Sequence, residues 1–136
     1  ATRAAGHRFI AGGELPRGPG YFIPPTVVDN PPDDARVVAE EPFGPVVPLM
    51  RFADTDEAVR RANASEYGLG ASGGTHDVAQ ARAVAAPLEG GTVWINTIHA
   101  LNPNAPFAGR KQSGLGVENG IEGLLEFTAP QTLALA

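Results

Sequence analysis

Residues 69–95 form the stretch that most limits the folds open to this chain. Its two ends, residues 69–72 and 92–95, are short runs of strand character, and the part between them has a helical pattern. Asp77 can cap that helix, whose apolar residues recur at helical spacing, at Val78, Ala81, Ala85 and Leu88. A strand, a helix and a strand with brief connections make a βαβ unit, so the sequence predicts an α/β fold with parallel strand pairing.

Local patterns predict the remaining elements. Aromatic and β-branched residues favour strands over residues 21–28 and 46–52, although a proline pair interrupts the first. Residues 35–40 are predicted to be extended. A capping-box pattern and apolar spacing predict a helix over residues 55–64, and apolar spacing alone predicts another over residues 118–127.

Two segments have no clear periodicity. Residues 96–116 form a long irregular stretch, and a loop of that length in a compact domain is usually functional, so substrate contacts are expected there. Residues 132–136 are an apolar tail that could add as a terminal strand, either to this chain or to a partner.

Composition excludes several classes of protein. A chain of 136 residues has the length of one domain, and 43% hydrophobic with 18% charged residues is ordinary globular composition. The net charge of −5 and the scattered basic residues argue against nucleic-acid binding, and the longest apolar run is too short for a membrane span. The start at Ala1, without a Met or signal peptide, suggests processing or a fragment and predicts a cytoplasmic location.

A loop at residues 40–46 carries two adjacent carboxylates and an aromatic ring between two prolines. Its sequence is Glu40-Glu41-Pro42-Phe43-Gly44-Pro45-Val46. The prolines restrict the backbone and Gly44 allows close approach, so the loop can hold a carboxylate and a ring at one spot. Adjacent carboxylates are most often a solvated turn, but this stiff loop is suited to presenting side chains to a ligand.

Several short motifs follow this loop in a fixed order. They are Ala62-Asn63, Tyr67-Gly68-Leu69, Gly91-Thr92-Val93-Trp94-Ile95-Asn96, Pro106-Phe107-Ala108-Gly109 and Lys111-Gln112-Ser113-Gly114. Together with the loop, they resemble the C-terminal part of an aldehyde dehydrogenase, from about Gly6 to about Leu133. The resemblance implies a three-layer α/β sheet with parallel βαβ units, as in the catalytic domain of that family, with residues 1–136 as its C-terminal part.

The resemblance implies roles for five residues. In aldehyde dehydrogenases, the counterpart of Glu41 accepts hydrogen bonds from the nicotinamide ribose, and the counterpart of Phe43 packs beside the nicotinamide. The counterparts of His99, Leu101 and Phe107 line the tunnel by which an aldehyde reaches the catalytic centre. NAD(P) is therefore the cofactor implied for a full-length enzyme.

The resemblance also implies what this chain lacks. Aldehyde dehydrogenases attack the aldehyde with a cysteine thiolate, pass a hydride to NAD(P), and hydrolyse the thioester with water activated by a glutamate. In the family both residues lie upstream of the matched region, and this sequence contains no cysteine and no dinucleotide-binding loop. We therefore expect no catalytic dehydrogenase residue, no cofactor and no aldehyde oxidation in the chain alone. Upstream dehydrogenase domains or further copies of the chain are the expected partners.

An alternative is a free-standing hydrolase that acts on a small ester. Residues 70–74 fit the G-x-S-x-G pattern of a nucleophile elbow. Aldehyde dehydrogenases usually have apolar and aromatic residues at the positions of Gly73 and Gly74. The candidate catalytic residues are Ser72 as nucleophile, His99 or His76 as base, and Glu89 or Asp77 as acid. If the dehydrogenase resemblance holds, Ser72 instead lies on a strand with no imidazole partner.

The sequence allows one further function and excludes a metal site. A third possible function is a non-catalytic module that assembles with a full-length dehydrogenase. No metal site is predicted, because the sequence has no cysteine and its three histidines, at positions 7, 76 and 99, have no ligand spacing.

Overall fold

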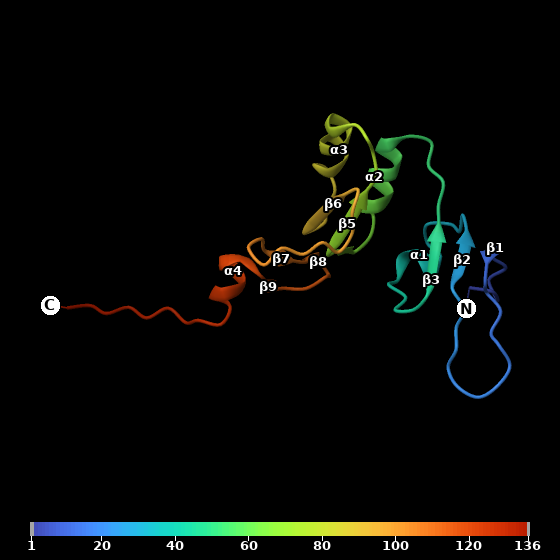
Figure 1. Cartoon of the computed structure of the whole chain (residues 1–136), viewed down its shortest axis with the longest axis horizontal. Helices are drawn as coiled ribbons and strands as arrows, with labels where there is room; N and C mark the ends of the chain where they lie inside the picture. Colours follow the sequence, from blue (N-terminus) through green and yellow to red (C-terminus); the bar gives the residue numbers. More distant parts are fainter. Residues whose placement is uncertain (1, 136) are drawn as a thin grey trace. The chain divides into compact units, whose positions relative to one another are not determined.

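The structure is a computed structural model that describes residues 2–135. The chain forms two compact units, Ala1–Asp54 and Thr55–Ala136. Both contain helices and parallel strand pairs, so the predicted α/β class is confirmed (Figure 1). No helix in the described part of the chain is long and apolar enough to cross a membrane.

The first unit is built on a three-stranded sheet in the order β1-β2-β3. Strand β2 (Thr26–Asp29) pairs antiparallel with β1 (Phe9–Ala11) and parallel with β3 (Val46–Leu49). The short helix α1 (Arg36–Ala39) lies in the crossover between β2 and β3. The core is small and centres on Val28, which is fully buried and packs with Ala35 and Val37.

Two predictions for the first unit are wrong. Residues 35–40 are not extended, because Arg36–Ala39 form a helical turn in which the N–H groups of Ala39 and Glu40 donate to the carbonyls of Ala35 and Arg36, at 2.9 Å each. The strand predicted over residues 21–28 begins only at Thr26. Pro24 and Pro25 have no backbone N–H for a ladder, and the Thr26 hydroxyl instead donates to the Pro24 carbonyl at 2.8 Å.

The second unit contains the predicted βαβ unit. Strands β5 (Gly70–Gly73) and β6 (Thr92–Ile95) pair in parallel, with helix α3 (Val78–Ala85) between them in the sequence. The Asp77 carboxylate caps α3 as predicted, accepting from the N–H groups of Ala79 at 2.8 Å and Gln80 at 3.2 Å. Helix α2 (Thr55–Asn63) precedes the βαβ unit in the sequence and confirms the predicted helix over residues 55–64.

The rest of the second unit consists of short pieces. Strand β4 (Tyr67–Gly68) pairs with β8 (Arg110–Lys111), and β7 (Phe107–Ala108) pairs with β9 (Val117–Glu118). Strands β7 and β8 thus lie inside the stretch predicted to be irregular. Helix α4 (Gly120–Leu125) is followed by a tail that forms no strand within residues 126–135 (Figure 1). Donation of that tail to a partner stays a prediction.

Candidate functional site

The loop at residues 40–46 carries two carboxylates, of which Glu40 is paired with an arginine and Glu41 is not. The Arg36 guanidinium donates to both oxygens of Glu40, at 2.7 Å each, and the Glu40 N–H donates to the Arg36 carbonyl at 2.9 Å. These side-chain hydrogen bonds lower the pKa of Glu40 and raise the pKa of Arg36 relative to their ordinary values. Glu41 makes no hydrogen bond or ion pair within residues 2–135. It is therefore the carboxylate that the loop leaves available.

The backbone of this loop is tightly turned. The Gly44 N–H donates to the Pro42 carbonyl at 3.0 Å, and the Val46 N–H donates to the Gly44 carbonyl at 2.8 Å. These are successive three-residue turns. The Pro45 carbonyl accepts from the Thr26 N–H at 2.8 Å, which ties the loop to β2. Because the turns are this tight, Phe43 points fully into solvent, at 100% exposure, and is free to contact a flat ring.

In the second unit, aromatic rings gather around Trp94 on β6. The ring of His99 meets the indole edge-on, with centroids 5.8 Å apart, and the ring of Phe107 lies 6.4 Å away. The indole Nε1–H donates to the Ala100 carbonyl at 3.0 Å. The structure thus brings the predicted substrate residues His99 and Phe107 to one buried side chain. Leu101 is 53% exposed on the same loop.

Sequence reasoning placed Trp94 on a strand and in one of the ordered motifs, but gave it no role in the site. A signal was present, because a buried indole N–H needs an acceptor and Trp94 stands just before the stretch predicted to be functional.

Asn96 is the first residue of the loop that follows β6, and its side chain binds the backbone of Thr75. Its side-chain oxygen accepts from the Thr75 N–H at 2.8 Å, and its side-chain nitrogen donates to the Thr75 carbonyl at 2.7 Å. The Asn96 backbone has φ of 56°, in the left-handed region that asparagine tolerates. Asn96 therefore joins the end of β6 to the turn before α3, as a turn-forming residue and not as a ligand-binding one.

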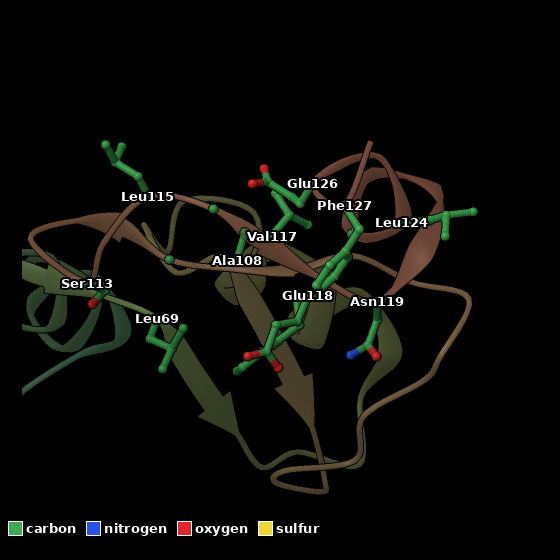
Figure 2. Close-up of a pocket in the computed structure, with 14 residues that line it drawn as sticks. Leu69, Ala108, Ser113, Leu115, Val117, Glu118, Asn119, Leu124, Glu126 and Phe127 are labelled. Atoms are coloured by element: carbon green, nitrogen blue, oxygen red, sulfur yellow. The ribbon is translucent and has the colours of Figure 1, made fainter. Parts of the chain in front are cut away.

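A groove of about 750 Å³ is lined in part by Phe107. Its lining is mostly apolar and includes Phe107, Val117 and Leu124, with the carboxylates of Glu118 and Glu126 among them. Figure 2 shows the side chains of Leu115 and Leu124 pointing outward from the ribbon, and both are more than half exposed. His99 and Leu101 do not line this groove. Of the predicted tunnel residues, only Phe107 borders it.

Lys111 links two of the motifs noted in the sequence, its own and Ala62-Asn63. Its ammonium donates to the carbonyls of Asn63 at 2.7 Å and Ser65 at 3.0 Å, and lies 2.6 Å from a Glu89 carboxylate oxygen. An ammonium has three protons, so all its donors have an acceptor. The Asn63 side chain completes the network by bonding the Pro87 carbonyl and the Glu89 N–H. We call Lys111 and its three acceptors the lysine staple.

Lys111→Met is expected to lower the free energy of unfolding of the second unit by about 2 kcal/mol, because it leaves the carbonyls of Asn63 and Ser65 and the Glu89 carboxylate without their charged donor. The measurement is urea unfolding followed by the fluorescence of Trp94, the sequence's one tryptophan. Arg110→Met is the matched control, because the neighbouring Arg110 makes no side-chain hydrogen bond with the described residues. Equal unfolding midpoints in the two variants would contradict the staple's role.

The candidate hydrolase residues do not form a triad. Ser72 lies inside β5, opposite Trp94 of β6, and not in the sharp turn that a nucleophile elbow requires. Within residues 2–135 its hydroxyl has no hydrogen bond to His76 or His99, as expected from the dehydrogenase resemblance. Asp77 is used as the cap of α3 and Glu89 is paired with Lys111. The alternative therefore has no geometric support.

Ser72→Ala is accordingly expected to leave hydrolysis of p-nitrophenyl acetate by the chain at the same rate as the unchanged protein, close to the rate in buffer. No base is placed to activate the hydroxyl, so its removal has nothing to abolish. Initial rates of the two proteins at equal concentration decide the matter. A clear activity that disappears in Ser72→Ala would restore the hydrolase hypothesis.

The described residues contain no group of three or more histidine, aspartate or glutamate side chains that could hold a metal ion. The first unit presents an unpaired Glu41 carboxylate and the exposed ring of Phe43, and the second unit gathers the rings of His99 and Phe107 around Trp94.

Comparisons with known proteins agree on one family. A family model described as "Aldehyde dehydrogenase family" matches residues 1–133. A putative aldehyde dehydrogenase from Gibberella moniliformis is 48% identical over 126 residues, which cover 93% of this chain and 27% of that protein. Human retinal dehydrogenase 2 is 43% identical over 132 residues, which cover 97% of this chain and 26% of that protein.

Solved structures give the same result. An aldehyde dehydrogenase from Bacillus cereus matches with a TM-score of 0.88 and 44% identity, over 94% of this chain and 26% of that one. Betaine aldehyde dehydrogenase from Staphylococcus aureus, solved in complex with NAD+, matches with a TM-score of 0.86 and 42% identity, over 93% of this chain and 26% of that one. The chain thus spans about a quarter of the length of the proteins it matches.

Proposed function

Because this chain belongs to the aldehyde dehydrogenase family, we propose that it is the C-terminal part of the catalytic domain of an NAD(P)-dependent aldehyde dehydrogenase. In this proposal Glu41 and Phe43 contact the nicotinamide riboside of the cofactor. His99, Leu101 and Phe107 contact the aldehyde on its way to the catalytic centre.

The observation that carries the proposal is that, of the two adjacent carboxylates in the loop at residues 40–46, one is paired and the other is not. Glu40 is occupied by Arg36 through both of its oxygens, whereas the neighbouring Glu41 is unpaired among the described residues and exposed. A free carboxylate can accept from two vicinal ribose hydroxyls at once, and charged acceptors make the stronger hydrogen bonds. Phe43, fully exposed two residues later, can lie against the nicotinamide ring. The residues present therefore fit a dinucleotide.

The chain's own part in the reaction is binding and orientation. NAD(P), when bound, accepts the hydride that leaves the substrate carbon. Glu41 fixes the ribose that bears the nicotinamide, and Phe43 limits the positions of that ring. Because the sequence contains no cysteine, the thiolate that attacks the aldehyde comes from a different segment. The chain alone is therefore not competent for aldehyde oxidation.

The exposed surface supports a need for further protein. The chain exposes 10445 Å². Two independently folded bodies of the sizes of the two units would together expose only about 8,000 Å², by the usual scaling of surface with mass. Large apolar side chains account for part of the excess, including Phe127, Leu133 and Leu135, each more than 80% exposed. Upstream dehydrogenase segments, or a second copy, are the partners we propose to cover them.

The test is a chimera in which this chain replaces the matching segment of the Bacillus cereus aldehyde dehydrogenase. We expect the purified chimera to reduce NAD+ or NADP+ in the presence of an aldehyde, and the isolated chain to do neither. The host enzyme with its segment deleted is the control for residual activity. A chimera that folds but does not oxidise any aldehyde with either dinucleotide would contradict the proposal.

A further inference from the structure

We propose that Trp94 is a positioning residue for the aldehyde-binding wall, by which we mean His99, Leu101 and Phe107. The indole of Trp94, buried on β6, holds the loop that carries His99 and orients Phe107. That this wall meets an aldehyde rests on the function proposed above. The contacts themselves belong to the second unit and do not depend on that function.

The neighbouring strand β5 restricts the position of Trp94. It pairs with Ser72 across the parallel β5-β6 ladder, and it is 8% exposed. On β5, a Cβ at Gly70 would lie 2.6 Å from Cζ3 of the indole, which is closer than real contacts allow. The absence of a side chain at Gly70 therefore makes room for the ring. Strand pairing and this close approach leave the indole little freedom to move.

From this place the indole holds a loop residue whose backbone conformation is unfavourable. His99 has φ of 55°, in the left-handed region, which raises the energy of a residue other than glycine. Such a conformation persists only where neighbouring groups hold it. Trp94 does so twice, because its ring meets the His99 ring edge-on and its Nε1–H binds the carbonyl of the next residue, Ala100, at 3.0 Å.

The same ring also reaches the far end of the loop. Phe107 lies 6.4 Å from Trp94 between ring centroids, with the planes tilted by 40°. Phe107 also lines the groove described above. One indole thus contacts both ends of the stretch 99–107, so a change at Trp94 should alter aldehyde binding although Trp94 itself touches neither the aldehyde nor the dinucleotide.

The test uses Trp94→Phe in the chimera, because phenylalanine keeps a ring but has no N–H donor. We expect the KM for aldehyde to rise about tenfold, which matches the loss of one buried hydrogen bond, with kcat and the KM for NAD+ changed less than twofold. Amide hydrogen exchange at residues 98–101 should become faster. Val93→Ala, which removes packing from the adjacent β6 residue, is the control and should leave both readouts unchanged.

Gly70→Ala is a second variant that keeps the donor but pushes on the ring, and it should also raise the aldehyde KM selectively. An unchanged aldehyde KM in Trp94→Phe, or unchanged exchange at residues 98–101, overturns the proposal. Equal rises in the KM values for aldehyde and NAD+ also overturn it, because they indicate general loosening. If the unaltered chimera folds but is inactive, the proposed function fails, and hydrogen exchange alone still decides whether Trp94 holds the loop.

Discussion

Gly91→Ala is expected to lower the free energy of unfolding of the second unit by about 3 kcal/mol, at the upper end of overpacking effects. A methyl group at residue 91 would overlap the carbonyl oxygen of Ala108 and lie 2.9 Å from its carbonyl carbon. Both obstacles are backbone atoms, so a rotamer change cannot relieve the clash. Strand β7 would have to move away from the segment before β6, and β7 carries Phe107. Urea unfolding followed by Trp94 fluorescence measures the loss.

Gly74→Ala is the matched control for this experiment. The nearest atom to a Cβ at Gly74 is the side-chain oxygen of Asn96 at 3.8 Å, which is ordinary contact. Both substitutions remove one glycine from the same unit, so their effects on the unfolded chain are similar. The difference between the two variants therefore isolates the clash. If both shift the unfolding midpoint equally, the close approach of residues 91 and 108 is not a stability determinant.

The second large effect concerns cofactor binding. In the chimera, Glu41→Gln is expected to raise the Kd for NAD+ by about tenfold or more. The amide keeps the size of the side chain but exchanges a charged acceptor of two hydroxyl hydrogen bonds for a neutral one. Hydrogen bonds to charged groups contribute about 1.5–3 kcal/mol, and 1.4 kcal/mol is tenfold in affinity. Titration of NAD+ against the quenching of protein fluorescence gives the constant.

Glu40→Gln makes the same chemical change one residue earlier and should leave the Kd for NAD+ within a factor of two. Glu40 already faces Arg36 with both oxygens, at 2.7 Å, so it has no free acceptor for a ribose. Equal losses of affinity in the two variants would mean that the loop acts through total charge and not through one placed carboxylate. An unchanged Kd in Glu41→Gln would remove this residue from the proposed site.

Sequence reasoning predicted the second unit best where local and tertiary preferences agree. The capping aspartate Asp77 and the apolar spacing after it define α3, and residues 92–95 form β6 as predicted. Local signals failed for α1, a four-residue helix with no side-chain cap. That helix is held by the burial of Ala35 and Val37, which depends on strands that lie elsewhere in the sequence.

The candidate site divides in the same way. The resemblance drew attention to Glu41 and Phe43, but the sequence did not show why Glu41 and not Glu40 is the free carboxylate, because that depends on Arg36 one helical turn earlier. The role of Trp94 was also out of reach. The indole N–H of Trp94 finds its acceptor at Ala100, and the ring finds room because Gly70 has no side chain. Both contacts depend on how neighbouring segments pack, which no periodicity in the sequence encodes.

The lysine staple has a practical consequence, because Lys111 is the only lysine in the sequence. Amine-acylating reagents can therefore modify a single side chain, with the α-amino group as their other target. To react, the Lys111 nitrogen must leave all three of its acceptors and lose a proton. The rate of its acylation, read by mass spectrometry, therefore reports how often the Lys111 side chain leaves its three acceptors, at one defined point of the second unit.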